Sequence, residues 1–190
     1  MFRHFPDHSK TVLDIGSNTG RGGAVLKVLS PNLEIIGLDC VPERLAKLDA
    51  AIYSQAFCCF GDKIPLADRV LDVIVGGEFI EHVPPLFEHV PPLSVEPTLA
   101  ELFRVLKLHG RVILTTPNPN YLKNKLKGLS VLTDISHVTQ HYPDILAWRL
   151  RQIGFSNVRI FGSGRVSSYL SEKIPCLPIY GSYLIQADKW

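Results

Sequence analysis

Three acidic or basic side chains of a kind that bind metal ions or move protons lie close together in the middle of the chain, at Glu78, Glu81 and His82. On a helical turn, separations of three and four residues would bring all three to one face. Carboxylates and imidazoles suit divalent ions such as Mg or Mn, and a bound cation lowers the pKa of a hydroxyl group. With the later His137 and His141, the cluster predicts a metal site. Without a metal, His82 or His137 would serve as a general base, because imidazole titrates near neutral pH.

A glycine-rich turn follows the first apolar run of the chain, which ends at Asp14. Gly16 and Gly20 lie in this turn, where glycine admits positive φ and lets a ligand approach the backbone closely. The free N–H groups of the next helix would face such a ligand. The spacing differs from the dinucleotide fingerprint, so it predicts a nucleotide-like ligand of another kind, or simply a turn.

Two further aspartates come at or just after the ends of predicted strands. Asp39 ends a strand at 33–39, where βαβ units place a carboxylate against ribose hydroxyls. Asp62 follows a strand at 55–60. Either could instead be a solvated loop residue.

Strand and helix patterns alternate along most of the chain, which predicts parallel βαβ units and an α/β fold. The helix at 97–108 is expected to end at His109-Gly110, and the last two strands are expected to pair antiparallel at an edge. The remaining expected elements are strands at 12–15, 70–75, 111–116, 157–161 and 182–187 and helices at 24–29, 41–45 and 143–153.

Two segments interrupt this pattern. Residues 81–86 recur as a direct tandem copy at 88–93, and we interpret 84–97 as a proline-rich duplicated insertion in which the first copy keeps the structural position. Residues 117–142 form a long loop that we expect on the substrate side. Its lysines, at 123, 125 and 127, could attract an anionic substrate or simply be solvated.

Composition limits the classes of function. The chain has 190 residues, a formal net charge of +2 and 46% hydrophobic residues, which fit one globular domain and give no strong signal for nucleic acid.

Residues 1–10 form a short leader without a signal-peptide core, and no apolar run is long enough to span a membrane. The four cysteines show no zinc pattern, so we expect free thiols and a cytoplasmic protein. Nothing here indicates an oligomeric state.

Several motifs agree in order with one known family. The segments 13–20, 37–39, 61–62, 71–74 and 78–83 resemble those of class I S-adenosylmethionine-dependent methyltransferases, and the leucine-rich 99–108 and Gly154-Phe155 fit the same pattern. The resemblance implies a single methyltransferase domain over 1–190. It also implies a Rossmann-like, mostly parallel sheet of seven strands, with helices on both faces and a C-terminal antiparallel strand pair. The family's usual Pro-Gly-Gly is replaced here by Leu108-His109-Gly110.

The resemblance also implies roles for individual residues. Asp14, Gly16 and Gly20 would bind the methionine part and ribose side of S-adenosylmethionine, Asp39 the ribose hydroxyls and Asp62 the adenine amine. Further cofactor contacts are expected at Ser17, Asn18, Cys40, Lys63 and Glu78.

The acidic and histidine cluster resembles that of two metal-dependent branches, the ubiquinone-pathway O-methyltransferases and the small-RNA 2′-O-methyltransferases. Glu78, Glu81, His82 and His137 would then hold Mg or Mn. In other class I members the histidine often just packs or caps beside the cofactor. The sequence therefore predicts a methyltransferase for a small-molecule acceptor, with a hydroxyl oxygen as its target. The alternatives are an RNA or other macromolecular acceptor and a non-catalytic cofactor-binding partner protein.

Overall fold

The structure is a computed structural model, which describes residues 1–83, 95–174 and 176–190. Most of the proline-rich insertion and the whole second copy of the duplication lie outside the described residues. From the first copy, Glu81 and His82 lie in a short 3₁₀ helix that begins three residues after the fourth strand ends.

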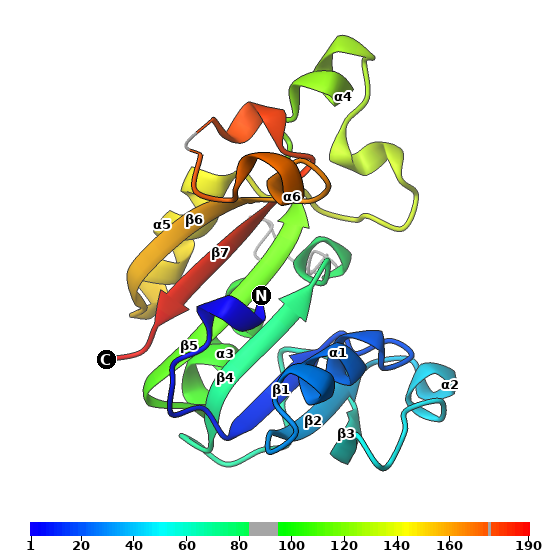
Figure 1. The fold of residues 1–190 in the computed structure, drawn as a ribbon, viewed down its shortest axis with the longest axis vertical. Coiled ribbons are helices and arrows are strands. Elements are labelled where there is room, and N and C mark those ends of the chain that lie inside the picture. Colours follow the sequence, from blue (N-terminus) through cyan, green and yellow to red (C-terminus); the bar gives the residue numbers. More distant parts are fainter. Residues whose placement is uncertain (84–94, 175) are drawn as a thin grey trace.

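One mixed sheet of seven strands forms the centre of the molecule, in the order β3-β2-β1-β4-β5-β7-β6 (Figure 1). The neighbouring strands β1 to β5 pair in parallel, and β7 pairs antiparallel with both β5 and β6. This confirms the α/β fold and the antiparallel C-terminal pair. The strands are β1 (Thr11–Ile15), β2 (Glu34–Asp39), β3 (Tyr53–Cys58), β4 (Leu71–Gly77), β5 (Leu106–Pro117), β6 (Ser156–Ser163) and β7 (Ser182–Asp188).

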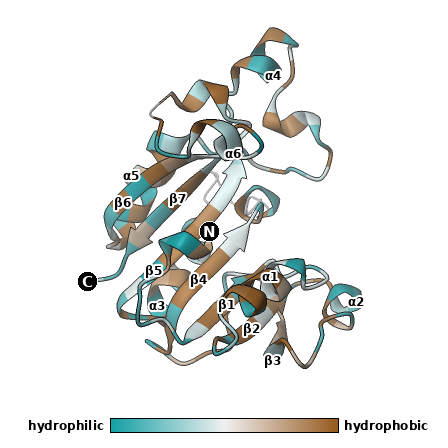
Figure 2. Ribbon diagram, viewed as in Figure 1, coloured by the Kyte–Doolittle hydropathy of each residue, from teal (hydrophilic) through white to brown (hydrophobic). Residues whose placement is uncertain are grey.

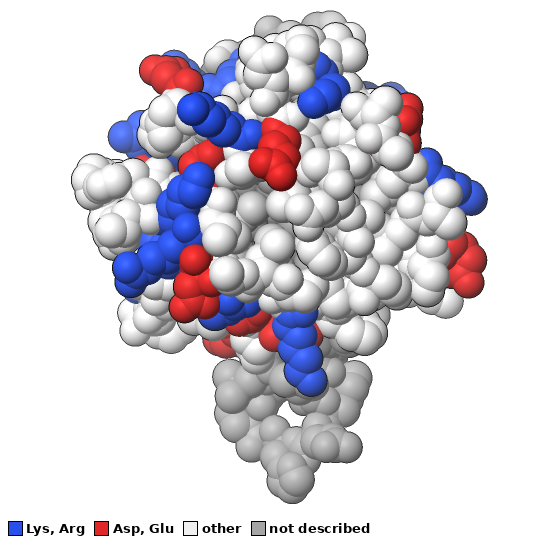
Figure 3. Space-filling view, turned by 90° about the horizontal axis from the view of Figure 1, so that it is seen from below, with Lys and Arg blue, Asp and Glu red and all other residues white. Residues whose placement is uncertain are grey.

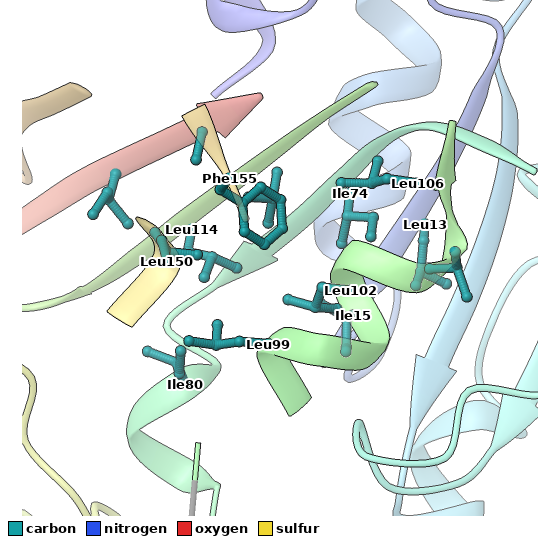
Figure 4. Packing of buried hydrophobic residues seen from close by; sticks show 14 of the residues in the cluster. Leu13, Ile15, Ile74, Ile80, Leu99, Leu102, Leu106, Leu114, Leu150 and Phe155 are labelled. Carbon is teal, nitrogen blue, oxygen red and sulfur yellow. The ribbon is translucent and has the colours of Figure 1, made fainter. Parts of the chain in front are cut away.

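Helices cover both faces of this sheet because each strand alternates its apolar side chains between two cores. On one face, α1 (Arg21–Leu29) and the N-terminal segment pack against β1 and β4. On the other, α3 (Glu96–Val105) and α5 (Pro143–Ile153) bury their apolar stripes. Figure 4 shows this second core, where Leu99 and Leu102 of α3 lie among side chains of the strands. Short helices complete the chain: α2 (Pro42–Leu45), α4 (Leu122–Leu126), α6 (Ser167–Leu170), η1 (Phe2–His4), η2 (Ile80–His82), η3 (Val131–Thr133) and η4 (Leu177–Ile179).

The predicted end of the helix at 97–108 was wrong by three residues. The helix ends at Val105, because Leu106 is already extended and pairs with Leu71 as the start of β5. His109 takes the left-handed backbone conformation, with φ of 64°. A Cβ at Gly110 would lie 3.1 Å from the carbonyl oxygen of Asp72, so this glycine permits a close strand contact and does not cap a helix.

Hydropathy along the strands indicates where a site can form. Figure 2 shows hydrophobic colours along the central strands and paler colours at the carboxyl ends of β4 and β5. These ends hold Gly76, Gly77, Thr115 and Thr116. The long segment 117–142 leaves the sheet at the same edge and projects beyond it, with α4 near its tip (Figure 1).

Candidate active site

The turn after β1 has the geometry that the sequence indicates. Gly16 has φ of 69°, and its N–H donates to the carbonyl oxygen of Leu38 at 2.8 Å. The N–H of Ser17 donates to the same oxygen at 3.0 Å, which fixes the turn against β2. The hydroxyl of Ser17 is buried and has no hydrogen-bond partner among the described residues. A ligand with a polar group would satisfy it, because buried polar groups are nearly always paired.

Asp14, at the end of β1, is buried beside this turn. Burial raises the pKa of its carboxyl group to about 6, although the hydroxyl of Tyr53 donates to Oδ2 at 2.7 Å and stabilises the charge. The N–H of Gly23 in turn donates to the hydroxyl oxygen of Tyr53 at 3.1 Å. A Cβ at Gly23 would lie 2.3 Å from that oxygen, so only glycine leaves room for Tyr53. Tyr53 could not be predicted from the sequence, because it lies 39 residues from Asp14 in a strand with no motif.

Asp39 organises the next loop at the end of β2. Its two carboxylate oxygens accept hydrogen bonds from the N–H groups of Asn18 at 2.9 Å and Val41 at 3.0 Å. Arg44 lies 3.7 Å from one of them. The carboxylate is therefore held in one orientation at the carboxyl edge of the sheet, where ligands bind in open α/β folds.

A cavity of about 1300 Å³ joins these groups. This exceeds the usual volume of a site for one small molecule, so a cofactor and an acceptor would fit together. Lys63 and Gly20, which we predicted as cofactor contacts, are not among the described residues of its lining. Gly20 serves the turn instead, with φ of 88°. The lining includes the other predicted cofactor residues, namely Asp14, Gly16, Ser17, Asn18, Asp39, Cys40, Asp62 and Glu78, and at the opposite rim His82 and Ser136.

The opposite rim brings together three of the predicted metal-binding side chains. The carboxylate of Glu81 and one ring nitrogen each of His82 and His137 lie within 4.8 Å of one another. Nδ1 of His82 lies 2.8 Å from the carbonyl oxygen of Ser136, and Nδ1 of His137 lies 2.9 Å from that of Val131. A carbonyl oxygen only accepts, so Nδ1 of each ring carries a proton and Nε2 is the nitrogen that remains to bind a ligand. This tautomer is typical of histidines that bind metals.

Glu81 is fully buried at the centre of this rim. Burial raises the pKa of its carboxyl group, while the hydroxyl of Thr116 donates to Oε2 at 2.9 Å. Oε1 is buried and has no partner among the described residues, so it is an open acceptor that faces no protein donor. The sequence predicts Thr116 only as the last residue of a strand and does not indicate this contact with Glu81.

Two predicted members of the cluster have other positions. Glu78 has φ of 49° and precedes the 3₁₀ helix η2, so it does not share a helical face with Glu81 and His82 as predicted. Burial and the neighbouring charge of Glu81 raise the pKa of Glu78 to about 7. His141 is buried 3.2 Å from the carbonyl oxygen of Ile80, and burial lowers its pKa to about 4. It supports the wall of the site and does not contribute a ligand.

Comparison with known proteins identifies this arrangement. A family model described as a methyltransferase domain matches residues 13–114, which is more than half of the chain. The chain belongs to this methyltransferase family. This family and its structural neighbours are class I S-adenosylmethionine-dependent methyltransferases.

Individual relatives agree with the family. The methyltransferase is 27% identical over 152 residues to a malonyl-[acyl-carrier protein] O-methyltransferase of Laribacter hongkongensis, covering 74% of this chain and 47% of the relative. It is also 27% identical over 139 residues to the enzyme of the same name from Gallionella capsiferriformans, covering 68% and 45%. The chain spans about half the length of these curated relatives. A SAM-dependent methyltransferase from Archaeoglobus fulgidus has the same fold, with a TM-score of 0.72, 21% identity, and coverage of 99% of this chain and 90% of that one.

Within residues 1–83, 95–174 and 176–190, we find no helix with the length and apolar character needed to cross a membrane.

Proposed function

We propose that this methyltransferase transfers a methyl group to the hydroxyl oxygen of a small-molecule acceptor bound between the cofactor turn and the rim formed by Glu81, His82 and His137. The observation that carries the proposal is the convergence of a buried carboxylate and two imidazoles within 4.8 Å. The names of the two curated relatives also specify an oxygen acceptor.

The three side chains fit a divalent cation of the Mg or Mn class. Oε1 of Glu81 is buried without a partner among the described residues, and both histidines have Nδ1 fixed on backbone carbonyls. Glu81, His82 and His137 would hold the ion, with Glu78 beside them as a further carboxylate whose pKa of about 7 would fall next to a cation. A bound cation would lower the pKa of the acceptor hydroxyl and orient it.

The chain itself has a limited chemical task. Transfer breaks the sulfur–methyl bond, forms an oxygen–methyl bond and releases the hydroxyl proton. The turn at Gly16 and the carboxylates of Asp14 and Asp39 orient the cofactor for transfer. Without a cation, Nε2 of His82 or His137 would accept the released proton, because Nδ1 of each ring is held by a backbone carbonyl.

An RNA acceptor is less well supported. Basic and acidic side chains are interspersed on the face that Figure 3 shows, so this face offers no continuous basic track for phosphates. The chain as a whole has a net charge of only +2.

Manganese binding tests the proposal most directly. We expect the metal-free protein to bind Mn²⁺, measured by electron paramagnetic resonance, and we expect Glu81→Gln and His137→Asn each to weaken binding at least tenfold. His109→Asn is the matched control, because His109 is exposed and distant from the rim, and asparagine tolerates its left-handed backbone.

Turnover separates the remaining possibilities. With labelled S-adenosylmethionine and a panel of hydroxyl acceptors, we expect activity that chelation abolishes and Mn²⁺ or Mg²⁺ restores. Activity that survives chelation would reject the metal and leave the histidines as the base. Cofactor binding without turnover on hydroxyl, amine or RNA acceptors would instead identify a non-catalytic partner protein.

A further inference from the structure

The segment between β5 and α5 exposes large apolar side chains in a way that the cofactor and acceptor sites do not explain. Ile135 is 99% exposed and Leu126 is 79% exposed, although such residues are normally buried. Figure 2 shows alternating hydrophobic and hydrophilic colours along this segment, which projects from the body of the molecule in Figure 1. Its exposed apolar side chains are those of Leu122, Leu126, Leu129, Leu132, Ile135 and Val138, and we call this surface the apolar tip.

Lysines accompany the apolar tip. Lys123, Lys125 and Lys127 are all exposed and alternate with its leucines, while Asp134 is the only acidic residue in 117–142. The whole formal net charge of +2 therefore lies in this segment, and the rest of the chain is balanced. A surface that combines apolar side chains with a local positive charge is complementary to an anionic amphiphile.

A groove of about 390 Å³ lies at the base of the tip, between α4 and η4. Leu122, Leu126 and Ile179 line it, and Lys123 and Lys127 are also part of its lining. An apolar groove with ammonium groups beside it matches a hydrocarbon chain that ends in an anionic headgroup.

We propose that the apolar tip docks on a bilayer surface rich in anionic phospholipid, with the lysines against headgroups and the groove around an acyl chain. The tip projects from the body of the molecule as a loop and exposes its apolar side chains (Figure 1). Such a shape inserts readily into a fluid interface, whereas a protein partner would need a complementary concave surface. Docking does not depend on the reaction proposed above. Because His137 belongs to the same segment, docking would bring the acceptor rim close to the bilayer.

Vesicle sedimentation tests the proposal. We expect the protein to bind vesicles of phosphatidylglycerol and phosphatidylcholine in equal parts, to bind pure phosphatidylcholine at least tenfold more weakly, and to dissociate at high salt. The combined Lys123→Gln, Lys125→Gln and Lys127→Gln variant should lower the partition coefficient on the order of 100-fold. Each lysine near an anionic surface contributes a similar binding free energy, so the three losses multiply in the partition coefficient. The pair Leu126→Asp and Ile135→Asp should lower it at least tenfold.

The control is Val28→Asp, which changes an apolar residue that is 82% exposed on α1, away from the tip. It should bind vesicles like the unchanged protein. Calorimetric titration with S-adenosylhomocysteine checks that each variant keeps its fold, and its outcome is independent of vesicle binding. Absence of binding to anionic vesicles, or equal loss in Val28→Asp, would overturn the proposal. A dimer in analytical ultracentrifugation that Leu126→Asp dissociates, without vesicle binding, would assign the tip to a second copy of the chain instead.

Discussion

The two rims of the cavity are built in different ways. On the cofactor side, Gly16 directly follows β1 and donates its N–H to the carbonyl oxygen of Leu38, and Asp39 at the end of the adjacent β2 accepts a hydrogen bond from the N–H of Asn18. On the acceptor side, His82 and Ser136 meet across 54 residues of sequence, through a hydrogen bond between a ring nitrogen and a loop carbonyl. One rim is determined by strand ends, and the other depends on how a long segment folds back over the sheet.

This difference predicts that the two rims fail separately. A change in the glycine turn should remove the cofactor and leave the cluster of Glu81, His82 and His137 in place. A change in the supports of that cluster should alter turnover or stability with little effect on cofactor affinity. Four changes test this separation.

Gly16→Val should have the largest effect. A β-branched residue strongly disfavours φ of 69°, and a Cβ there would lie 2.9 Å from the ring of Phe79. We expect affinity for S-adenosylhomocysteine, measured by calorimetry, to fall on the order of 1000-fold, while Mn²⁺ binding changes less than threefold. Gly128→Val is the matched control, because Gly128 has φ of 67° and open space around its Cα. Equal losses in both variants would mean that backbone strain alone, anywhere in the chain, reduces cofactor binding.

His141 tests the stability of the acceptor side. Its folded pKa of about 4 is below the ordinary value of 6.5, so protonation favours the unfolded chain. The stability it contributes is complete above pH 6.5 and falls by roughly 3 kcal/mol as pH decreases through 4. Glu78 and Glu81 have raised pKa values and therefore the opposite slope, so the quantity to measure is the difference from His141→Gln. Urea unfolding between pH 4 and 7 should show this difference shrinking with acidity. A constant difference would show that His141 is not kept neutral by burial.

Asp72 gives the corresponding test for the frame below both rims. It accepts hydrogen bonds from the N–H and hydroxyl of Thr11 and from Nζ of Lys107, joining β1, β4 and β5. Burial alone would raise its pKa, but these donors hold it at about 2. Asp72→Asn should cost about 2 kcal/mol of unfolding free energy. Because the folded pKa is depressed, this contribution persists above pH 4 and is lost only as pH falls through 2. On acidification the contribution of His141 should therefore be lost before that of Asp72, and the reverse order in the pH dependence of the two variants would contradict the comparison.

The same contrast explains what the sequence could predict. The alternation of strands and helices along the chain, the glycine turn and the position of Asp39 at a strand end follow from local patterns, because hydrophobic periodicity and turn residues act over short distances. Tyr53 and Thr116 could not be found this way, since each meets its carboxylate only in the folded chain, across 39 and 35 residues of sequence. We predicted that Glu78 and Glu81 share one face of a helical turn, but the positive φ of Glu78 breaks the helical geometry at that residue. Local spacing therefore identified carboxylates and imidazoles as candidate ligands, and tertiary packing determined which of these side chains come together.

Thr116→Val should have the smallest effect and makes the sharpest test of the acceptor rim. The change keeps the shape of the side chain and removes the hydroxyl that donates to Oε2 of Glu81, which leaves both oxygens of a buried carboxylate without a protein donor. Loss of the donor should raise the pKa of Glu81 further, so turnover should fall about tenfold at neutral pH and recover as pH rises. Thr116→Ser keeps the hydroxyl and loses the methyl group. It should therefore retain both turnover and the pH profile, whereas a packing role for the methyl group would make the serine variant the defective one. Affinity for S-adenosylhomocysteine should stay within threefold in both variants. If instead affinity and turnover fell together, the two rims would be energetically coupled through β5, and the separation argued above would be wrong.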